Sequence, residues 1–270
     1  MKKHFNTITQ FKRRMIVAGN VIEVYEYEKP ICKGFAKRKV GRGNSLHTSQ
    51  EVKAHNREKT AQRARAVVRR TANANPQLKK FLTLTYAENM TDLTKARMDL
   101  DKFVKRVKTR YKEFQYIAVV EFQTRGAIHF HLLCNLPFVD VNDLATVWRY
   151  GFIKINKIDN VDNVGAYITK YMTKENLDNR LIGRKCYSMS KDLNKADIYT
   201  KEEDIEEVLE CLDNVKRTHS AEFSTEYYGV VTYTQIVCTS AIRAPRQRRS
   251  SFRRRKDWLI PLPDDTPCPF

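Results

Sequence analysis

Three side chains that bind metal ions well lie close together in the segment EFQTRGAIHFHLLCN, residues 121–135. They are Glu121, His129 and His131. Imidazole nitrogens and carboxylate oxygens are common ligands of divalent cations in proteins. Such a set has a chemical use only if the fold brings all three side chains to one place.

The short sequence TRG inside this segment predicts a hairpin whose strands cover 115–122 and 127–135. Side chains two residues apart on a strand share a face, so both histidines point the same way. With Gly126 in the left-handed position of a three-residue loop, Glu121 falls opposite His129. Cross-strand neighbours have Cβ atoms about 5 Å apart, so we expect the three side chains to converge.

Two neutral imidazoles and one carboxylate form an open site that suits Mg²⁺ or Mn²⁺ and leaves positions for water or phosphate oxygens. The plain alternative is a pair of surface histidines beside a solvated glutamate. The same ligand set also occurs in non-haem Fe(II) oxygenases. Those sites usually lie in a larger β framework, and so basic a protein gives no reason for oxygen chemistry.

A second chemical pattern is YITKYMTK, in which Tyr167 and Lys170 are followed by Tyr171 and Lys174. The segment predicts a helix over 160–176 that carries all four residues on one arc, so both phenols can reach the same phosphate. A phenol with a pKa of about 10 becomes a useful nucleophile when a metal polarises the electrophile and lysines offset its charge. The alternative is one packed tyrosine with solvated lysines. An adjoining apolar stripe is formed by Val164, Ile168 and Met172.

The elements that must position these residues follow the order β-α-β-β-α-β-α. Strands are predicted at 81–86, 115–122, 127–135 and 151–158, and helices at 93–111, 141–150 and 160–176. This order predicts an α+β fold of the split βαβ, ferredoxin-like kind. We expect one antiparallel sheet with helices on one face and the other face free for a ligand.

The sequence on either side of this core is less informative. Residues 1–80 read as a basic N-terminal extension, with a strand at 21–30 and a long arginine-rich helix from about Ser49. Residues 81–180 form the predicted core, and 181–242 a mixed α/β extension. A basic flexible tail is expected over 243–270.

The charge of the chain favours a polyanionic partner. The sequence has 50 Lys and Arg against 31 Asp and Glu, a net charge of +19, and its first 80 residues hold 20 basic and 5 acidic residues. Nucleic acid is the commonest polyanion that such a field attracts. No apolar run has the length of a signal peptide or membrane span, and the six cysteines lack metal-site spacing. We therefore expect a cytoplasmic protein with no membrane partner.

Three motifs occur in a fixed order: FLTLTY, then E-x7-H-x-H, then VGAYITKYMTK. Together they resemble the motifs of HUH endonucleases, the rolling-circle replication initiators, in which two histidines flank a hydrophobic residue, here Phe130. The doubled tyrosine is similar to that of replication-associated proteins from single-stranded DNA phages and related plasmids. The resemblance covers roughly residues 60–176.

This resemblance implies a nickase in which His129, His131 and Glu121 hold the metal ion. It implies that Tyr167 and Tyr171 are nucleophiles, with charge stabilised by Lys170 and Lys174. The implied reaction at a single-stranded DNA origin yields a 5′-phosphotyrosine and a free 3′-hydroxyl that primes synthesis. The context Val164-x-x-Tyr167-x-x-Lys170 fits single-tyrosine initiators and favours Tyr167 as the first nucleophile. No NTPase motif is present, so we expect a separate host helicase in a bacterial cytoplasm.

Two further readings share this element order. An RRM-like module would bind single-stranded nucleic acid without catalysis, but it needs stacking aromatics on the central strands. Phe130 points away from the histidines and is expected in the core. A transposase or conjugative relaxase would be a variant of the HUH reading.

Overall fold

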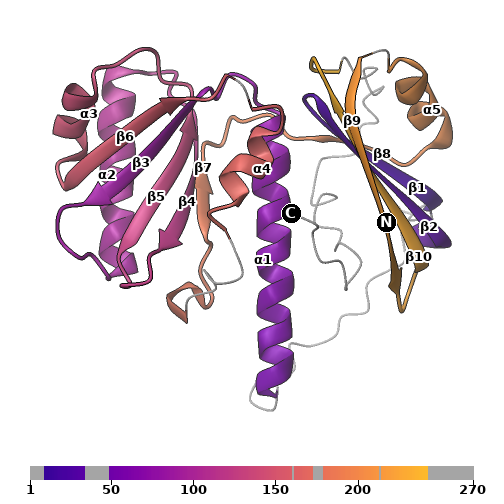
Figure 1. Cartoon of the computed structure of the whole chain (residues 1–270). Helices are drawn as coiled ribbons and strands as arrows, with labels where there is room; N and C mark the ends of the chain where they lie inside the picture. The colour runs from indigo at the N-terminus through magenta and orange to yellow at the C-terminus, as the bar shows by residue number, and fades with distance from the viewer. Residues whose placement is uncertain (1–8, 34–48, 160, 173–178, 213, 243–270) are drawn as a thin grey trace, which may run out of the picture. The chain divides into compact units, whose positions relative to one another are not determined.

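The computed structural model describes residues 9–33, 49–159, 161–172, 179–212 and 214–242. The chain forms two compact units, which we call the core unit (57–195) and the flanking unit (1–56 with 196–270). Each unit contains a five-stranded antiparallel sheet (Figure 1). The predicted basic tail over 243–270 lies outside the described residues.

The core unit contains the elements that the chemical motifs predict. Its strands are β3 (Lys80–Tyr86), β4 (Tyr116–Phe122), β5 (Ile128–Cys134), β6 (Gly151–Lys157) and β7 (Tyr187–Met189). Its helices are α1 (Gln50–Asn73, from residue 57 onward), α2 (Leu93–Arg110), α3 (Val141–Trp148), α4 (Val164–Thr169) and a 3-10 turn at Asn179–Leu181. The strand order is β6-β3-β5-β4-β7.

This order confirms the predicted α+β fold. The four strands of the β-α-β-β-α-β unit lie in the order fourth, first, third, second, and each neighbouring pair is antiparallel. That is the split βαβ arrangement, and β7 adds one strand at the β4 edge.

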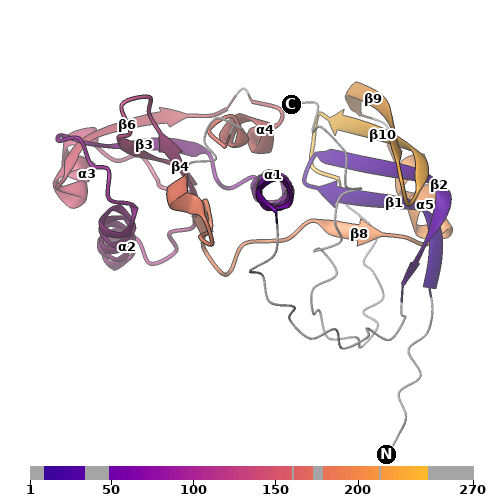
Figure 2. The same ribbon diagram turned by 90° about the horizontal axis from the view of Figure 1, so that it is seen from below.

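Helices α2 and α3 lie on one side of this sheet (Figure 2). Asp92 begins α2 by accepting hydrogen bonds from the backbone of Thr94 (2.8 Å) and Lys95 (3.2 Å). The apolar stripe of α2 then packs with α3 against the sheet, and Phe103 and Trp148 are fully buried there. Burial of such side chains is the main source of stability for this layer.

The opposite face of the sheet is partly covered, although the sequence pattern predicted that it would be free. Val68 and Ala72 of α1, with Ile168 of α4, pack onto Phe81 and Leu133 of the sheet. The amphipathic patterns of α2 and α3 do not reveal this layer, because α1 is mostly polar and only its C-terminal end is buried. One half of the face is covered and the other half stays open.

The C-terminal end of α1 holds the N-terminal end of α4. The side chain of Asn73 accepts a hydrogen bond from the backbone of Gly165 (2.7 Å) and donates one to Asn163 (3.0 Å). Asn163 caps α4 by accepting from the backbone of Ala166 (2.9 Å). At Gly165 an added Cβ would lie 2.2 Å from the carbonyl oxygen of Arg69, so only glycine permits this approach. The contact fixes the helix that carries the tyrosines.

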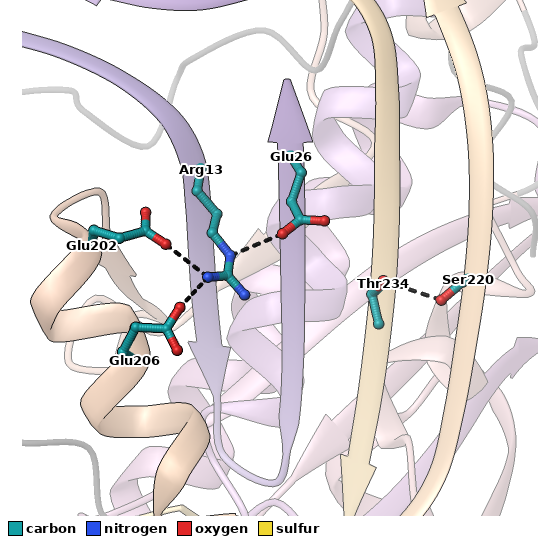
Figure 3. A network of polar contacts seen from close by, with 6 residues as sticks. All are labelled: Arg13, Glu26, Glu202, Glu206, Ser220 and Thr234. Atoms are coloured by element: carbon teal, nitrogen blue, oxygen red, sulfur yellow. Dashed lines mark hydrogen bonds and ion pairs between the residues drawn. The ribbon is translucent and has the colours of Figure 1, made fainter. Parts of the chain in front are cut away.

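The flanking unit is a separate sheet with one helix. Its elements are β1 (Thr9–Ala18), β2 (Val21–Lys33), β8 (Asp197–Tyr199), α5 (Glu202–Glu210), β9 (Val215–Thr225) and β10 (Gly229–Cys238), in the strand order β8-β1-β2-β10-β9. Arg13 of β1 ties α5 to the sheet (Figure 3). Its guanidinium binds Glu202 at 2.7 Å, Glu206, and Glu26 of β2 at 3.1 Å.

Local sequence patterns predicted β2, α5 and a β-rich segment over 223–237, but they did not predict β1. They also gave no sign that strands from the two ends of the chain share a sheet, as β2 and β10 do. That pairing joins residues about two hundred positions apart, for which local patterns carry no signal. None of the helices in the described part of the chain is long and apolar enough to cross a membrane.

Gly165→Ala should destabilise the core unit by about 1–3 kcal/mol, because the new methyl group forces α4 away from α1. The free energy of unfolding in urea measures this loss. Lys170→Ala, at an exposed position just after α4, is the matched control and should unfold as the wild type does. Equal stability of the Gly165 variant and the wild type would contradict the close contact.

Candidate metal and tyrosine site

The β4–β5 hairpin has the predicted register. Gly126 has φ +82°, and its backbone N–H donates to the carbonyl of Gln123 at 2.7 Å. The Gln123 N–H in turn donates to the carbonyl of Ala127 at 2.9 Å. Glu121 therefore pairs directly with His129, which confirms the sequence prediction.

The three candidate ligands converge. One ligand atom each of Glu121, His129 and His131 lies within 4.8 Å of the other two. The Nε2 atom of His131 is 2.7 Å from the Glu121 carboxylate. This hydrogen bond is the main cause that holds the pKa of Glu121 below its ordinary value, so the carboxylate is ionised at neutral pH.

Two neighbouring side chains orient the imidazoles. Thr83 of β3 lies opposite His131, and its Oγ1 is 3.1 Å from the Nδ1 of that ring. The amide nitrogen of Gln123 is 3.3 Å from the Nδ1 of His129. Second contacts of this kind fix the ring orientation of metal-binding histidines and tune their basicity.

The surroundings of the histidines suit a cation. His131 is 4 % exposed, whereas His129 and Glu121 are half-buried and reach solvent. Burial lowers the pKa of His129, which keeps its imidazole neutral and able to ligate at neutral pH. The Nε2 atom of His129 is buried and has no hydrogen-bond partner among the described residues. A divalent ion with nitrogen and oxygen ligands would satisfy it.

The tyrosine segment differs from the expected long helix. The regular part of α4 ends at Thr169, and Tyr171 lies in the turn that follows, where its N–H donates to the carbonyl of Ile168 at 3.3 Å. The predicted stripe of Val164, Ile168 and Met172 does pack against the sheet. The rings of Tyr167 and Tyr171 are still neighbours, with centroids 6.4 Å apart.

Tyr171 contacts the candidate ligands directly. Its ring stacks on His131 with centroids 3.8 Å apart and planes 23° from parallel. Tyr167 instead packs edge-on against Phe81 at 5.0 Å. Burial, followed by the neighbouring Tyr167, raises the pKa of Tyr171, so its phenol is protonated at neutral pH.

The two candidate lysines have different standing. Lys170 is exposed, and its Nζ lies 5.8 Å from the centre of the Tyr167 ring. Lys174 lies outside the described residues. The structure therefore brings six of the seven candidate residues into the core unit and says nothing of the seventh.

Thr83, Gln123 and Phe81 touch the candidate site but were not singled out from the sequence. Phe81 stacks on Tyr171 with centroids 5.4 Å apart. A signal for Thr83 was present, because alternation in FLTLTY puts Phe81, Thr83 and Thr85 on one face of β3. The missing information was which strand lies beside β3.

Comparison with known proteins identifies one family. Residues 79–176 match the sequence model of the replication-associated protein ORF2 family. The matched segment runs from the start of β3 past both tyrosines, and it includes the three converging ligands. No curated protein and no solved structure matches the chain. The core is thus similar to replication-associated proteins, which indicates a role in the initiation of replication.

Glu121→Gln should lower the pKa of the His129 imidazole further, because the Glu121 carboxylate opposes the effect of burial by stabilising the charged ring. NMR titration of the imidazole protons in metal-free buffer measures this shift. Glu113→Gln, at an exposed position beyond the far end of β4, is the control and should leave the titration unchanged. An unchanged His129 titration in the Glu121 variant would show that the two groups are not neighbours.

Proposed function

We propose that this protein is an HUH-type endonuclease of the two-tyrosine type. It would nick and rejoin single-stranded DNA at a replication origin and so initiate rolling-circle replication. The observation that carries the proposal is the stacking of Tyr171 on His131, at 3.8 Å between ring centroids. A potential nucleophile thereby touches a side chain of the candidate ligand set.

The residues fit a divalent cation. His129, His131 and Glu121 would hold Mg²⁺ or Mn²⁺, and the ion would polarise the scissile phosphate when bound. With metal at the Nε2 of His131, the Nδ1 of that ring carries the proton and donates it to Thr83. Thr83 is therefore a positioning residue for the ligand.

Tyr171 would attack the phosphorus through its phenolic oxygen. A bond forms between that oxygen and phosphorus, the bond from phosphorus to the 3′ oxygen breaks, and the products are a 5′-phosphotyrosine and a 3′-hydroxyl. The proton lost by the phenol balances the proton gained by the 3′ oxygen. Because the raised pKa of Tyr171 disfavours a free phenolate, the proton leaves as attack proceeds. Lys170 and Lys174 would offset the charge on the phosphate.

Tyr167 would serve as the second nucleophile. While one tyrosine holds the 5′ end, the other can cut the newly made strand, and reversal of the first step rejoins DNA because the phosphodiester energy is conserved. The sequence context favoured Tyr167 as the first nucleophile. The ring contact with His131 favours Tyr171, and we assign the first cut to it.

The proposed partners follow from this chemistry. The substrate is a single-stranded origin, and the net charge of +19 supports its capture. We infer that a separate host helicase opens the duplex and that the protein acts in the cytoplasm of a bacterial host.

The proposal is tested by a DNA–protein adduct that survives SDS when the protein is incubated with Mn²⁺ and single strands from its native replicon. Tyr171→Phe should sharply reduce the adduct, and the double variant with Tyr167→Phe should abolish it. His129→Ala should remove cleavage but spare DNA binding. DNA binding that ignores EDTA, with no adduct on any strand, would favour the RRM-like binding module instead.

Thr83→Val should weaken Mn²⁺ affinity by about 10- to 100-fold, because the partner that orients His131 is lost while the shape is kept. Calorimetric titration with Mn²⁺ measures the affinity. Thr85→Val, on the same face of β3 but opposite His129, is the matched control. If both variants bind Mn²⁺ as the wild type does, Thr83 has no part in the site.

A further inference from the structure

The face of the core sheet that carries the histidines is divided into two halves. Around Phe81, Ile117 and Leu133 it is covered by α1 and α4. The other half continues from the histidines across β3 to the edge strand β6. There the side chains of Phe152 and Lys154 are exposed.

Strand register places these two residues level with the candidate ligands. Phe152 pairs with Thr85, which pairs with His129 on the next strand. Lys154 pairs with Thr83, which pairs with His131, and thus forms a second row. Each row spans two strand spacings, so Phe152 and Lys154 lie about 10 Å from the imidazoles.

Phe152 is 69 % exposed, which is unusual for a large aromatic side chain on an edge strand. Its neighbours Ile153 and Ile155 pack into the opposite layer, and the alternation of β6 leaves Phe152 and Lys154 on the open half. An exposed aromatic ring beside a lysine is the combination that binds single-stranded nucleic acid, through base stacking and phosphate contact.

We propose that Phe152 stacks on a base of the single-stranded DNA and that Lys154 contacts the adjacent phosphate. The strand thus enters the site across β6 and β3. The inference rests on the proposed function, since the substrate is the same. The path follows from the covered half, where α1 and α4 occupy the face, and from β7, which pairs along β4 from Ile117 to Val119.

The test is binding of a fluorescein-labelled oligothymidylate to the full-length protein in EDTA, measured by fluorescence anisotropy. Phe152→Ala should weaken binding by about tenfold, the fold-change expected for one lost base stack. Phe152→Trp should restore it, whereas Phe152→Leu should not. Phe138→Ala is the matched control, because Phe138 is 91 % exposed but follows the end of β5 farthest from His129.

A fluorescent base analogue placed at successive positions of an origin oligonucleotide locates the stack. Wild type should quench it at one position near the cleavage site, and Phe152→Ala should remove that quenching alone. Lys154→Gln should weaken binding and reduce its dependence on salt. Equal binding by Phe152→Ala and wild type, with unchanged quenching, would overturn the proposal. So would a change of oligomeric state in Phe152→Ala without loss of DNA binding.

This test separates the two proposals. If the wild type forms no covalent adduct but Phe152→Ala still loses binding and quenching, the nicking proposal fails and the stacking site stands. If the adduct forms while the Phe152 variants bind and quench as the wild type does, the nickase stands and the stacking site is wrong.

Discussion

The antiparallel pairing of β4 with β5 is the constraint on which the candidate site depends. Side chains on a strand alternate between faces, so a slip of one residue would send Glu121 and the histidines to opposite sides of the sheet. The three-residue turn prevents that slip, because Gly126 at φ +82° closes a loop of fixed length. A local feature of backbone geometry thus gathers three ligands from one short segment.

A second constraint joins the hairpin to the tyrosines, and it is not local. The position of α4 depends on α1, through the hydrogen bonds of Asn73 and the close approach at Gly165. This contact leads the turn after α4 over His131, where Tyr171 stacks. The polar helix before the core therefore has a structural role in placing the candidate nucleophile.

The parts of the fold that local patterns encode were predicted well, and the parts that depend on distant contacts were not. Alternation and turn residues gave the hairpin register and the ferredoxin-like order. The partial cover by α1 escaped prediction because only its last turns are apolar enough to be buried. The role of Thr83 escaped because it depends on which strand lies beside β3. The shared sheet of β2 and β10 escaped for the same reason.

The most direct test of the central claim is anomalous X-ray diffraction from crystals soaked in Mn²⁺. We predict one strong anomalous peak about 2.2 Å from an imidazole nitrogen of each histidine and from the Glu121 carboxylate, with Tyr171 beside it. A peak elsewhere on the molecule, or none at the hairpin when Mn²⁺ is in excess, would contradict it.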